Sequence, residues 1–203
     1  MSDAREHWDT IFAQKSDDEM SWYQDVPTTS LELLARWSQP EEPLIDIGAG
    51  NARLVDHLIE RGWRDVTLLD VSHEALAAVR RRLSATEALV AYVVADIREW
   101  SPPRRYRAWH DRAVFHFLVS TLDQRAYVET AARSLESGAV LVIATFSSSG
   151  PTQCSGLPVA QHDPEEIGRL FASHFDLVTS QLQDHTTPFN SVQSFAWTVL
   201  RRR

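Results

Sequence analysis

Short apolar runs alternate with amphipathic stretches along most of this chain, and this pattern limits the folds that it can adopt. The apolar runs at 43–47, 66–70, 89–95, 108–115 and 139–146 are rich in Val, Leu, Ile and Ala. Stretches with apolar residues at helical spacing separate them. The alternation predicts βαβ units and an α/β fold with a mostly parallel sheet. With 203 residues, the chain is long enough to form one such domain.

Local signals mark the ends of several expected helices. A helix and a loop are expected within 5–23, Ser72 can cap the helix after the second strand, and Pro164 occupies a first helical position. Further helices are expected at 29–37, from the first strand's end to about 61, and at 123–135, with Gly138 ending the last of these. Two β-rich runs, 175–183 and 193–200, predict an antiparallel hairpin.

Acidic residues outnumber basic ones, and the formal net charge is -8. Phosphate backbones and anionic membranes attract clustered positive charge, so neither nucleic acid nor a membrane is expected as a partner. The arginine runs 80–82 and 201–203 are interpreted as a solvated helix face and a frayed tail.

Compartment is indicated by cysteine use and by the first residues of the chain. Cys154 is the single cysteine, so an intrachain disulfide is excluded. Residues 1–9 are polar, unlike a secretory signal, and no apolar stretch approaches the roughly 20 residues that a membrane span requires. We therefore expect a soluble, cytoplasmic protein.

The first expected strand runs into a glycine turn with the sequence LIDIGAGNAR. Gly48 and Gly50 let the backbone turn sharply and approach a ligand closely, and the next helix presents free N–H groups. A ligand at this turn would lie at the carboxyl ends of the strands. Gly48, Ala49, Gly50 and Asn51 are therefore candidate cofactor-binding residues.

Charge at this turn discriminates between two cofactor classes. The dinucleotide fingerprint GxGxxG requires a third glycine where this chain has Arg53. Asp46, two residues before Gly48, can accept a hydrogen bond from an amino group but would repel a pyrophosphate. S-adenosylmethionine (SAM) has an ammonium group, a sulfonium and no phosphate, so the DxGxG pattern favours SAM.

Two further acids follow the second and third expected strands. Asp70 could accept hydrogen bonds from both ribose hydroxyls, and Asp96 could accept one from the adenine amine. Val71 and Ile97 follow these acids and could enclose the adenine. One acid alone is more typical of a helix cap or a turn, but acids at three successive strand ends indicate a nucleoside site.

These segments resemble the motifs of class I SAM-dependent methyltransferases, and the resemblance covers almost the whole chain from about Trp8. LIDIGAGNA resembles the family's glycine loop, LLDVS its ribose motif, VVADI its adenine motif and WHDRAVFHFL its fourth-strand motif, which lines the methyl-transfer pocket. One departure is Asn51-Ala52, where many members have a third glycine.

The resemblance implies one SAM-dependent methyltransferase domain over residues 1–203. The implied fold is a Rossmann-like seven-stranded mixed sheet of order 3-2-1-4-5-7-6, with strand 7 antiparallel and helices on both faces. HWDTIF and SWYQ resemble the lid of members that act on small molecules, and we call residues 1–28 the lid segment.

The acceptor side has weaker signals. His116 is the candidate catalytic residue, as a base or substrate orienter, because its ordinary pKa of about 6.5 suits proton transfer; the alternative is a hydrogen-bonded core or rim histidine. Asp111 could orient the cofactor or substrate, and Arg112 could pair with Asp111 or with a substrate carboxylate. Trp22 could cover the sulfonium through a cation–π contact or pack in the core.

The loop at 147–162 is rich in Ser, Gly and Pro and is long for a compact domain, which favours a role in the substrate pocket. Cys154, His162 and His185 match no standard zinc spacing, so no metal is expected.

Several functions fit these patterns. The favoured one is in-line transfer of the SAM methyl group to a small molecule, in which the protein aligns a nucleophile with the methyl and excludes water. A protein side chain is the alternative acceptor. An NAD(P)-dependent oxidoreductase, which Arg53 opposes, and a non-catalytic SAM-binding protein are alternatives of other classes.

Overall fold

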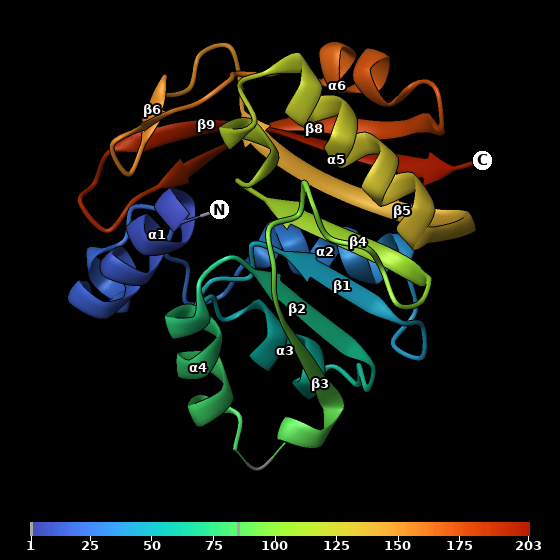
Figure 1. Cartoon of the computed structure of the whole chain (residues 1–203). Coiled ribbons are helices and arrows are strands. Elements are labelled where there is room, and N and C mark those ends of the chain that lie inside the picture. Colours follow the sequence, from blue (N-terminus) through green and yellow to red (C-terminus); the bar gives the residue numbers. More distant parts are fainter. Residues whose placement is uncertain (1, 85) are drawn as a thin grey trace.

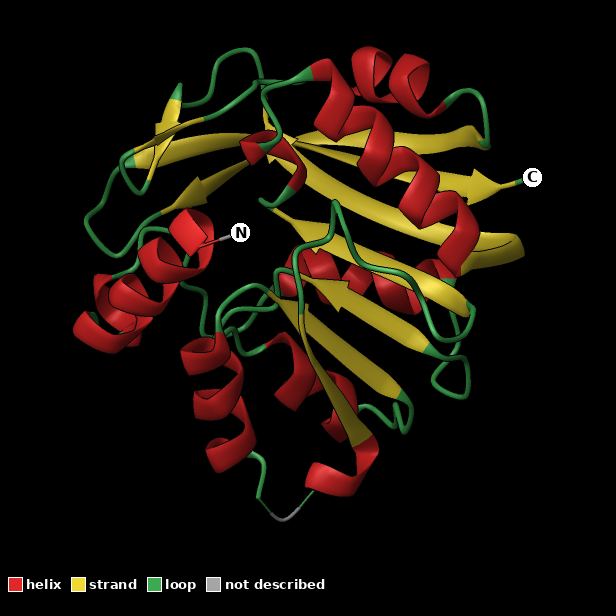
Figure 2. Cartoon of the chain, viewed as in Figure 1, coloured by secondary structure: helices red, strands yellow, loops and turns green. Residues whose placement is uncertain are grey.

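A computed structural model describes residues 2–84 and 86–203 as a central sheet with helices on both faces (Figures 1 and 2). The strands are β1 (Leu44–Ile47), β2 (Val66–Asp70), β3 (Val90–Val94), β4 (Tyr106–Arg112), β5 (Leu135–Phe146), β6 (Gln153–Cys154), β7 (Leu157–Pro158), β8 (Phe175–Thr186) and β9 (Val192–Arg202). The α-helices are α1 (Ser2–Gln14), α2 (Thr28–Trp37), α3 (Leu54–Glu60), α4 (His73–Arg82), α5 (Thr121–Ser134) and α6 (Pro164–Phe171). Met1, the first residue of the lid segment, and Ala85 lie outside the described residues.

The seven strands of the sheet have the order β3-β2-β1-β4-β5-β9-β8. The first five are parallel, and β9 runs antiparallel to both β5 and β8. β6 and β7 form a separate two-stranded hairpin. When this hairpin is left out of the count, the order is 3-2-1-4-5-7-6 with strand 7 antiparallel. The predicted Rossmann-like fold is therefore confirmed.

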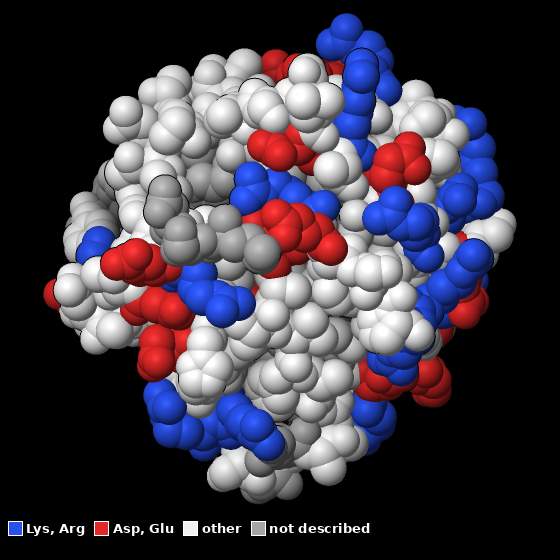
Figure 3. All heavy atoms as spheres, viewed as in Figure 1, with Lys and Arg blue, Asp and Glu red and all other residues white. Residues whose placement is uncertain are grey.

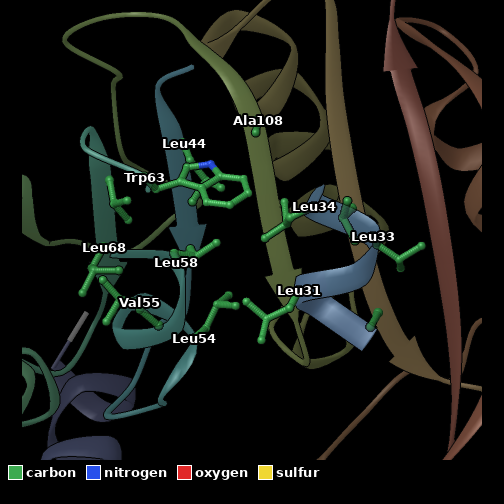
Figure 4. Close-up of a cluster of buried hydrophobic side chains, with 14 of the residues drawn as sticks. Leu31, Leu33, Leu34, Leu44, Leu54, Val55, Leu58, Trp63, Leu68 and Ala108 are labelled. Atoms are coloured by element: carbon green, nitrogen blue, oxygen red, sulfur yellow. The ribbon is translucent and has the colours of Figure 1, made fainter. Parts of the chain in front are cut away.

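Apolar side chains fill the space between the sheet and the helices on each face. On one face, leucines of α2 and α3 meet residues of β1, β2 and β4 (Figure 4); these include Leu31, Leu34, Leu54, Leu58, Leu44, Leu68 and Ala108. On the other face, α5 and α6 contribute Tyr127, Val128, Ile167 and Phe171, which pack with Ile45, Trp109 and Ile143. Full burial of one such side chain contributes about 1.5–3 kcal/mol. The two cores hold the strand ends in fixed relative positions.

Two predicted element ends differ from the structure, and a residue with positive φ lies near each. β4 ends at Arg112 rather than at 115, since Ala113 has a φ of 74° and a 3-10 turn follows. Gly138, with a φ of 80°, lies inside β5 instead of ending the preceding helix. Helix α5 passes directly into β5 at Leu135.

The interpretation of the arginine runs needs correction. Arg82 forms an ion pair of 2.7 Å with Asp56 and donates to the carbonyl of Asn51 at 3.0 Å, so it ties α4 to the glycine turn. Arg203 pairs with Asp176 beside β8 at 2.8 Å, so the tail is not frayed. On the face shown in Figure 3, basic and acidic side chains are interspersed over the described residues. Within residues 2–84 and 86–203, each helix is too short or too polar to traverse a bilayer.

Candidate active site

A cavity of about 340 Å³ lies at the carboxyl ends of the parallel strands, within the range typical of ligand sites. Its lining residues fall into two groups along the strand order, which we call the turn side and the β9 side. The turn side contains the glycine turn with Asp70, Val71, Asp96 and Ile97, which follow or end β1, β2 and β3. The β9 side contains Arg112, Phe146, Cys154, Gln193 and Phe195.

The glycine turn has no room for larger residues at two positions. Gly48 has a φ of 62°, and a Cβ atom there would lie 1.9 Å from Cγ2 of Val114. Gly50 has a φ of 54°, and its Cβ would lie 3.1 Å from the Phe12 ring of α1. The Gly48 N–H donates to the carbonyl of Leu69 at 2.7 Å, which holds the turn against β2. The turn therefore presents bare backbone to the cavity.

Two backbone N–H groups hold the carboxylate of Asp70, which lines the cavity. Its Oδ2 accepts from the Gly50 N–H and its Oδ1 from the Ser72 N–H, each at 2.8 Å. A carboxylate has about four acceptor sites, so both oxygens can still accept from a ligand. Burial raises the pKa of Asp70 to about 6, against the lowering effect of these two N–H groups.

Asp46 is held by a chain of buried side chains. His110 of β4 donates from Nδ1 to Oδ1 of Asp46 at 2.7 Å, and its Nε2 accepts from the Ser30 hydroxyl of α2 at 2.9 Å. The carboxylate can only accept, and this fixes the ring tautomer. His110 therefore orients Asp46 toward the cavity that all three residues line.

Asp96 is engaged by a neighbouring cation. Arg98 donates from Nε to both carboxylate oxygens, at 3.0 and 3.1 Å. Partial burial raises the pKa of Asp96, but the hydrogen bonds from Arg98 outweigh it and lower the pKa below its ordinary value. An adenine amine would have to share this acceptor with Arg98. Val71 and Ile97 line the same part of the cavity.

The lid segment covers the cavity with aromatic rings. Trp8 of α1 lies 5.9 Å from Trp22 and 5.3 Å from Phe117, both in edge-to-face contact. Asp9 holds this helix, because its Oδ1 accepts from the Ser72 hydroxyl at 2.6 Å and from the Glu74 N–H at 3.2 Å. The predicted cofactor-binding residue Trp22 thus lines the cavity inside an aromatic cluster.

The structure places Asp111, which was predicted to bind the cofactor, away from the cavity lining. Asp111 is fully buried on the α5 side of β4, one residue out of phase with His110, and it is not among the residues that line the cavity. Its carboxylate accepts from the N–H groups of Val114 and Phe115 and from the Tyr127 hydroxyl. It stabilises the turn after β4.

The structure places His116, the predicted base, in a buried position away from the cavity lining. The bend at Ala113 turns His116 inward, where its ring centroid lies 4.6 Å from that of Phe146, outside the cavity lining. Burial, followed by the effects of His162 and Arg112, lowers the pKa of His116 to about 3. A ring with so low a pKa is a poor proton acceptor near neutral pH.

Comparison with known proteins supplies the chemistry of this cavity. Residues 44–138, from β1 to the start of β5, match a methyltransferase domain family. Residues 44–138 therefore make up a methyltransferase domain, as the resemblance to class I SAM-dependent methyltransferases implied. The match is at odds with the oxidoreductase alternative, which Arg53 already opposed.

The chain is also similar to individual proteins over most of its length. It is 17% identical to a SAM-dependent methyltransferase from Anabaena variabilis, with a TM-score of 0.76, covering 100% of this chain and 94% of that one. It is 19% identical to the 1,6-didemethyltoxoflavin-N1-methyltransferase of Burkholderia thailandensis, with a TM-score of 0.70, covering 99% and 84%. These likenesses show the fold.

A curated relative is the eEF1A lysine and N-terminal methyltransferase of Bos taurus. It is 20% identical over 142 residues, which are 68% of this chain. The chain covers 20% of the length of that relative.

Sequence reasoning missed several residues of the methyltransferase site. Trp8 and Phe12 line the cavity, and their spacing of four residues places them on one helix face, a signal that was available. His110 could not be found in this way, because only the folded strands bring it to Asp46. The pairing of Arg98 with Asp96 was also missed. Cys154 of the 147–162 loop lines the β9 side.

The three residues considered for a metal have separate surroundings. His185 donates from Nε2 to the carbonyl of Ser21 at 2.8 Å, and His162 packs on Phe115 with ring centroids 5.3 Å apart. Among the described residues, no group of three or more potential metal ligands comes together.

Proposed function

We propose that this methyltransferase binds SAM on the turn side of the cavity and transfers the methyl group to a small-molecule acceptor on the β9 side. The observation that carries the proposal is the covered cavity: α1 lies over the glycine turn, and the β6-β7 hairpin contributes Cys154, Leu157 and Pro158 to its wall. A partly covered, largely apolar cavity of about 340 Å³ suits a small ligand.

The residues of the turn side fit SAM. Gly48, Ala49, Gly50 and Asn51 line this side, and we assign their backbone to the methionine part of SAM. We assign Asp46 to its ammonium group and Asp70 to the ribose hydroxyls. Three carboxylates line this side, where a phosphate would be repelled.

The remaining cofactor contacts concern the adenine and the sulfonium. We assign Val71 and Ile97 to the faces of the adenine and Asp96 to its amine, shared with Arg98. We assign Trp22, which lines the cavity, to the sulfonium, which its ring can attract by about 0.5–2 kcal/mol. Asp111 supports these contacts only through the turn that carries Val114.

Catalysis rests mainly on positioning. SAM supplies a methyl group that is already activated on sulfur. The protein holds the acceptor in line with that methyl, and the aromatic cluster of Trp8, Trp22 and Phe117 keeps water out. Such alignment can lower the barrier by about 7–11 kcal/mol. Both nitrogens of His110 are engaged by hydrogen bonds, so we assign it a positioning role toward Asp46.

A protein side chain is the second candidate acceptor. Its support comes from the curated relatives, which are named as lysine and N-terminal methyltransferases of eEF1A. Exposed apolar residues also flank the cavity, since Val119 is 55% exposed and Leu122 is 76% exposed. Such residues could contact a protein partner.

The test is methyl transfer from radiolabelled SAM to a cell extract divided by filtration into small molecules and proteins. Label in the small-molecule fraction supports the proposal, whereas label in the protein fraction alone favours the second candidate. Thermal shifts with SAM, S-adenosylhomocysteine (SAH) and NAD accompany it. Binding of SAM with no transfer to either fraction would contradict both candidates.

A further inference from the structure

Arg112 places a positive charge on the β9 side of the cavity. It is the last residue of β4 and lines the cavity. Its Nη1 donates to the carbonyl of Trp22 at 2.8 Å, and its guanidinium carbon lies 5.1 Å from the centre of the Phe195 ring. These two contacts from the lid segment and β9 fix the orientation of the guanidinium.

The charge of Arg112 has no acidic partner among the described residues. Its Nη2 is buried without a hydrogen-bond partner in the described part of the chain. Asp111, the neighbour considered for a salt bridge, faces α5 instead. Burial lowers the pKa of Arg112 to about 10, so it stays charged near neutral pH.

The acids that line the cavity all lie on the turn side, and each has a hydrogen-bond or ion-pair partner there. Asp46 accepts from His110, Asp70 accepts from two backbone N–H groups, and Asp96 pairs with Arg98. A buried cation without a partner is costly. Its retention in a ligand cavity indicates that a ligand supplies the missing anion.

We propose that Arg112 binds a carboxylate of the methyl acceptor, so that the substrates are small organic acids. This inference rests on the proposed function. One free Nη2 and one positive charge suit a carboxylate monoanion, whereas a phosphate would need more donors than Arg112 and Gln193 present. The carboxylate of SAM is the other possible source. We assign the acceptor's, because the guanidinium of Arg112 contacts Trp22 and the Phe195 ring on the β9 side of the cavity.

The first measurement is methyl transfer from radiolabelled SAM to a small-molecule extract split by anion exchange into anionic and non-anionic fractions. We expect label in the anionic fraction. Arg112→Gln should lower kcat/KM for that fraction by about 10- to 100-fold, the effect of removing a charged hydrogen bond, and Arg112→Lys should recover part of it. Arg125→Gln, exposed on α5, is the matched control.

The second measurement is calorimetry with SAH and with 5′-methylthioadenosine, which lacks the carboxylate. SAH affinity within twofold of wild type in Arg112→Gln supports the assignment and shows that the variant is folded. Loss of SAH affinity with unchanged 5′-methylthioadenosine affinity assigns Arg112 to the cofactor and overturns the inference.

The fractions separate the two proposals. Label confined to non-anionic small molecules overturns the inference and leaves the proposed function standing. Label in proteins alone, or in no fraction, overturns the proposed function and the inference with it.

Discussion

The two sides of the cavity are built in different ways. The turn side consists of short continuous segments at three strand ends, and each carboxylate there is held by neighbours such as the Gly50 and Ser72 N–H groups. The β9 side is assembled from residues far apart in the chain, including Arg112, Cys154 and Phe195, and its cation has no acidic partner among the described residues. Local backbone hydrogen bonds fix the geometry of the turn side, whereas the β9 side has a charge that a ligand can pair with.

The largest effect is expected where the turn side is tightest. Gly48→Ala would place a methyl group 1.9 Å from Val114 on a backbone with a φ of 62°. We expect SAH affinity to fall roughly 100-fold in calorimetry. Gly138→Ala is the matched control, because its φ is 80° but the nearest atom is Arg107 Nη1 at 3.8 Å. It should lose about 1–2 kcal/mol of stability and keep its SAH affinity; equal affinities of the two variants would show that the turn is not tight.

A smaller loss of binding is expected at the ribose acceptor. Asp70→Asn keeps the shape of the side chain but removes its charge, so SAH should bind about 10-fold more weakly by calorimetry. Asp65→Asn, at the opposite end of the same strand and paired with Arg104, is the control and should bind normally. Unchanged affinity in Asp70→Asn would remove this residue from the cofactor side.

The pH dependence of binding tests the same carboxylate without mutation. Because burial raises the pKa of Asp70 to about 6, acidification below that value protonates it and should weaken SAH binding several-fold, whereas Asp70→Asn should show no such change. The free protein should respond with the opposite sign. A carboxyl with a raised pKa contributes stability that is complete below its unfolded value of 3.8 and is lost as pH rises through about 6.

Asp111 enters that stability measurement as well, because burial also raises its pKa to about 6. Its distance from the cavity lining predicts that it affects the unfolding free energy and not SAH affinity. A weakening of SAH binding at low pH that persists in Asp70→Asn would assign the effect to another group.

The smallest effect is expected from the hydrogen bonds by which Asp9 joins α1 to the start of α4. Asp9→Ala removes the acceptor for the Ser72 hydroxyl and the Glu74 N–H, so SAH should dissociate about two- to fivefold faster in stopped-flow measurements. Asp184→Ala, exposed on β8, should leave the rate unchanged. A rate equal to wild type in Asp9→Ala would show that these hydrogen bonds do not hold the helix.

The contrast between the two sides also explains what the sequence could predict. Asp46, the glycine turn, Asp70 and Asp96 lie at strand ends, and strand ends follow from local apolar runs. The sheet order followed from family resemblance. The roles of His116 and Asp111 could not be judged locally, because the positive φ of Ala113 redirects the chain after Arg112. No short-range pattern predicts that bend for an alanine.

Arg112 illustrates the same limit. Its sequence neighbour Asp111 suggested an ion pair, but adjacent residues in a strand point to opposite faces. The partners that matter come from Trp22 and Phe195, which only the folded chain brings near.

The position of the first helix has a consequence for the rate of turnover. Its Phe12 ring rests on Gly50, and Trp8 closes over the same space. We expect SAH to be exchanged for SAM by a movement of this helix, so that each cycle includes a displacement through solvent. Steady-state velocity should therefore decline as viscosity is raised with glycerol, even though the displacement at sulfur involves no bulk motion.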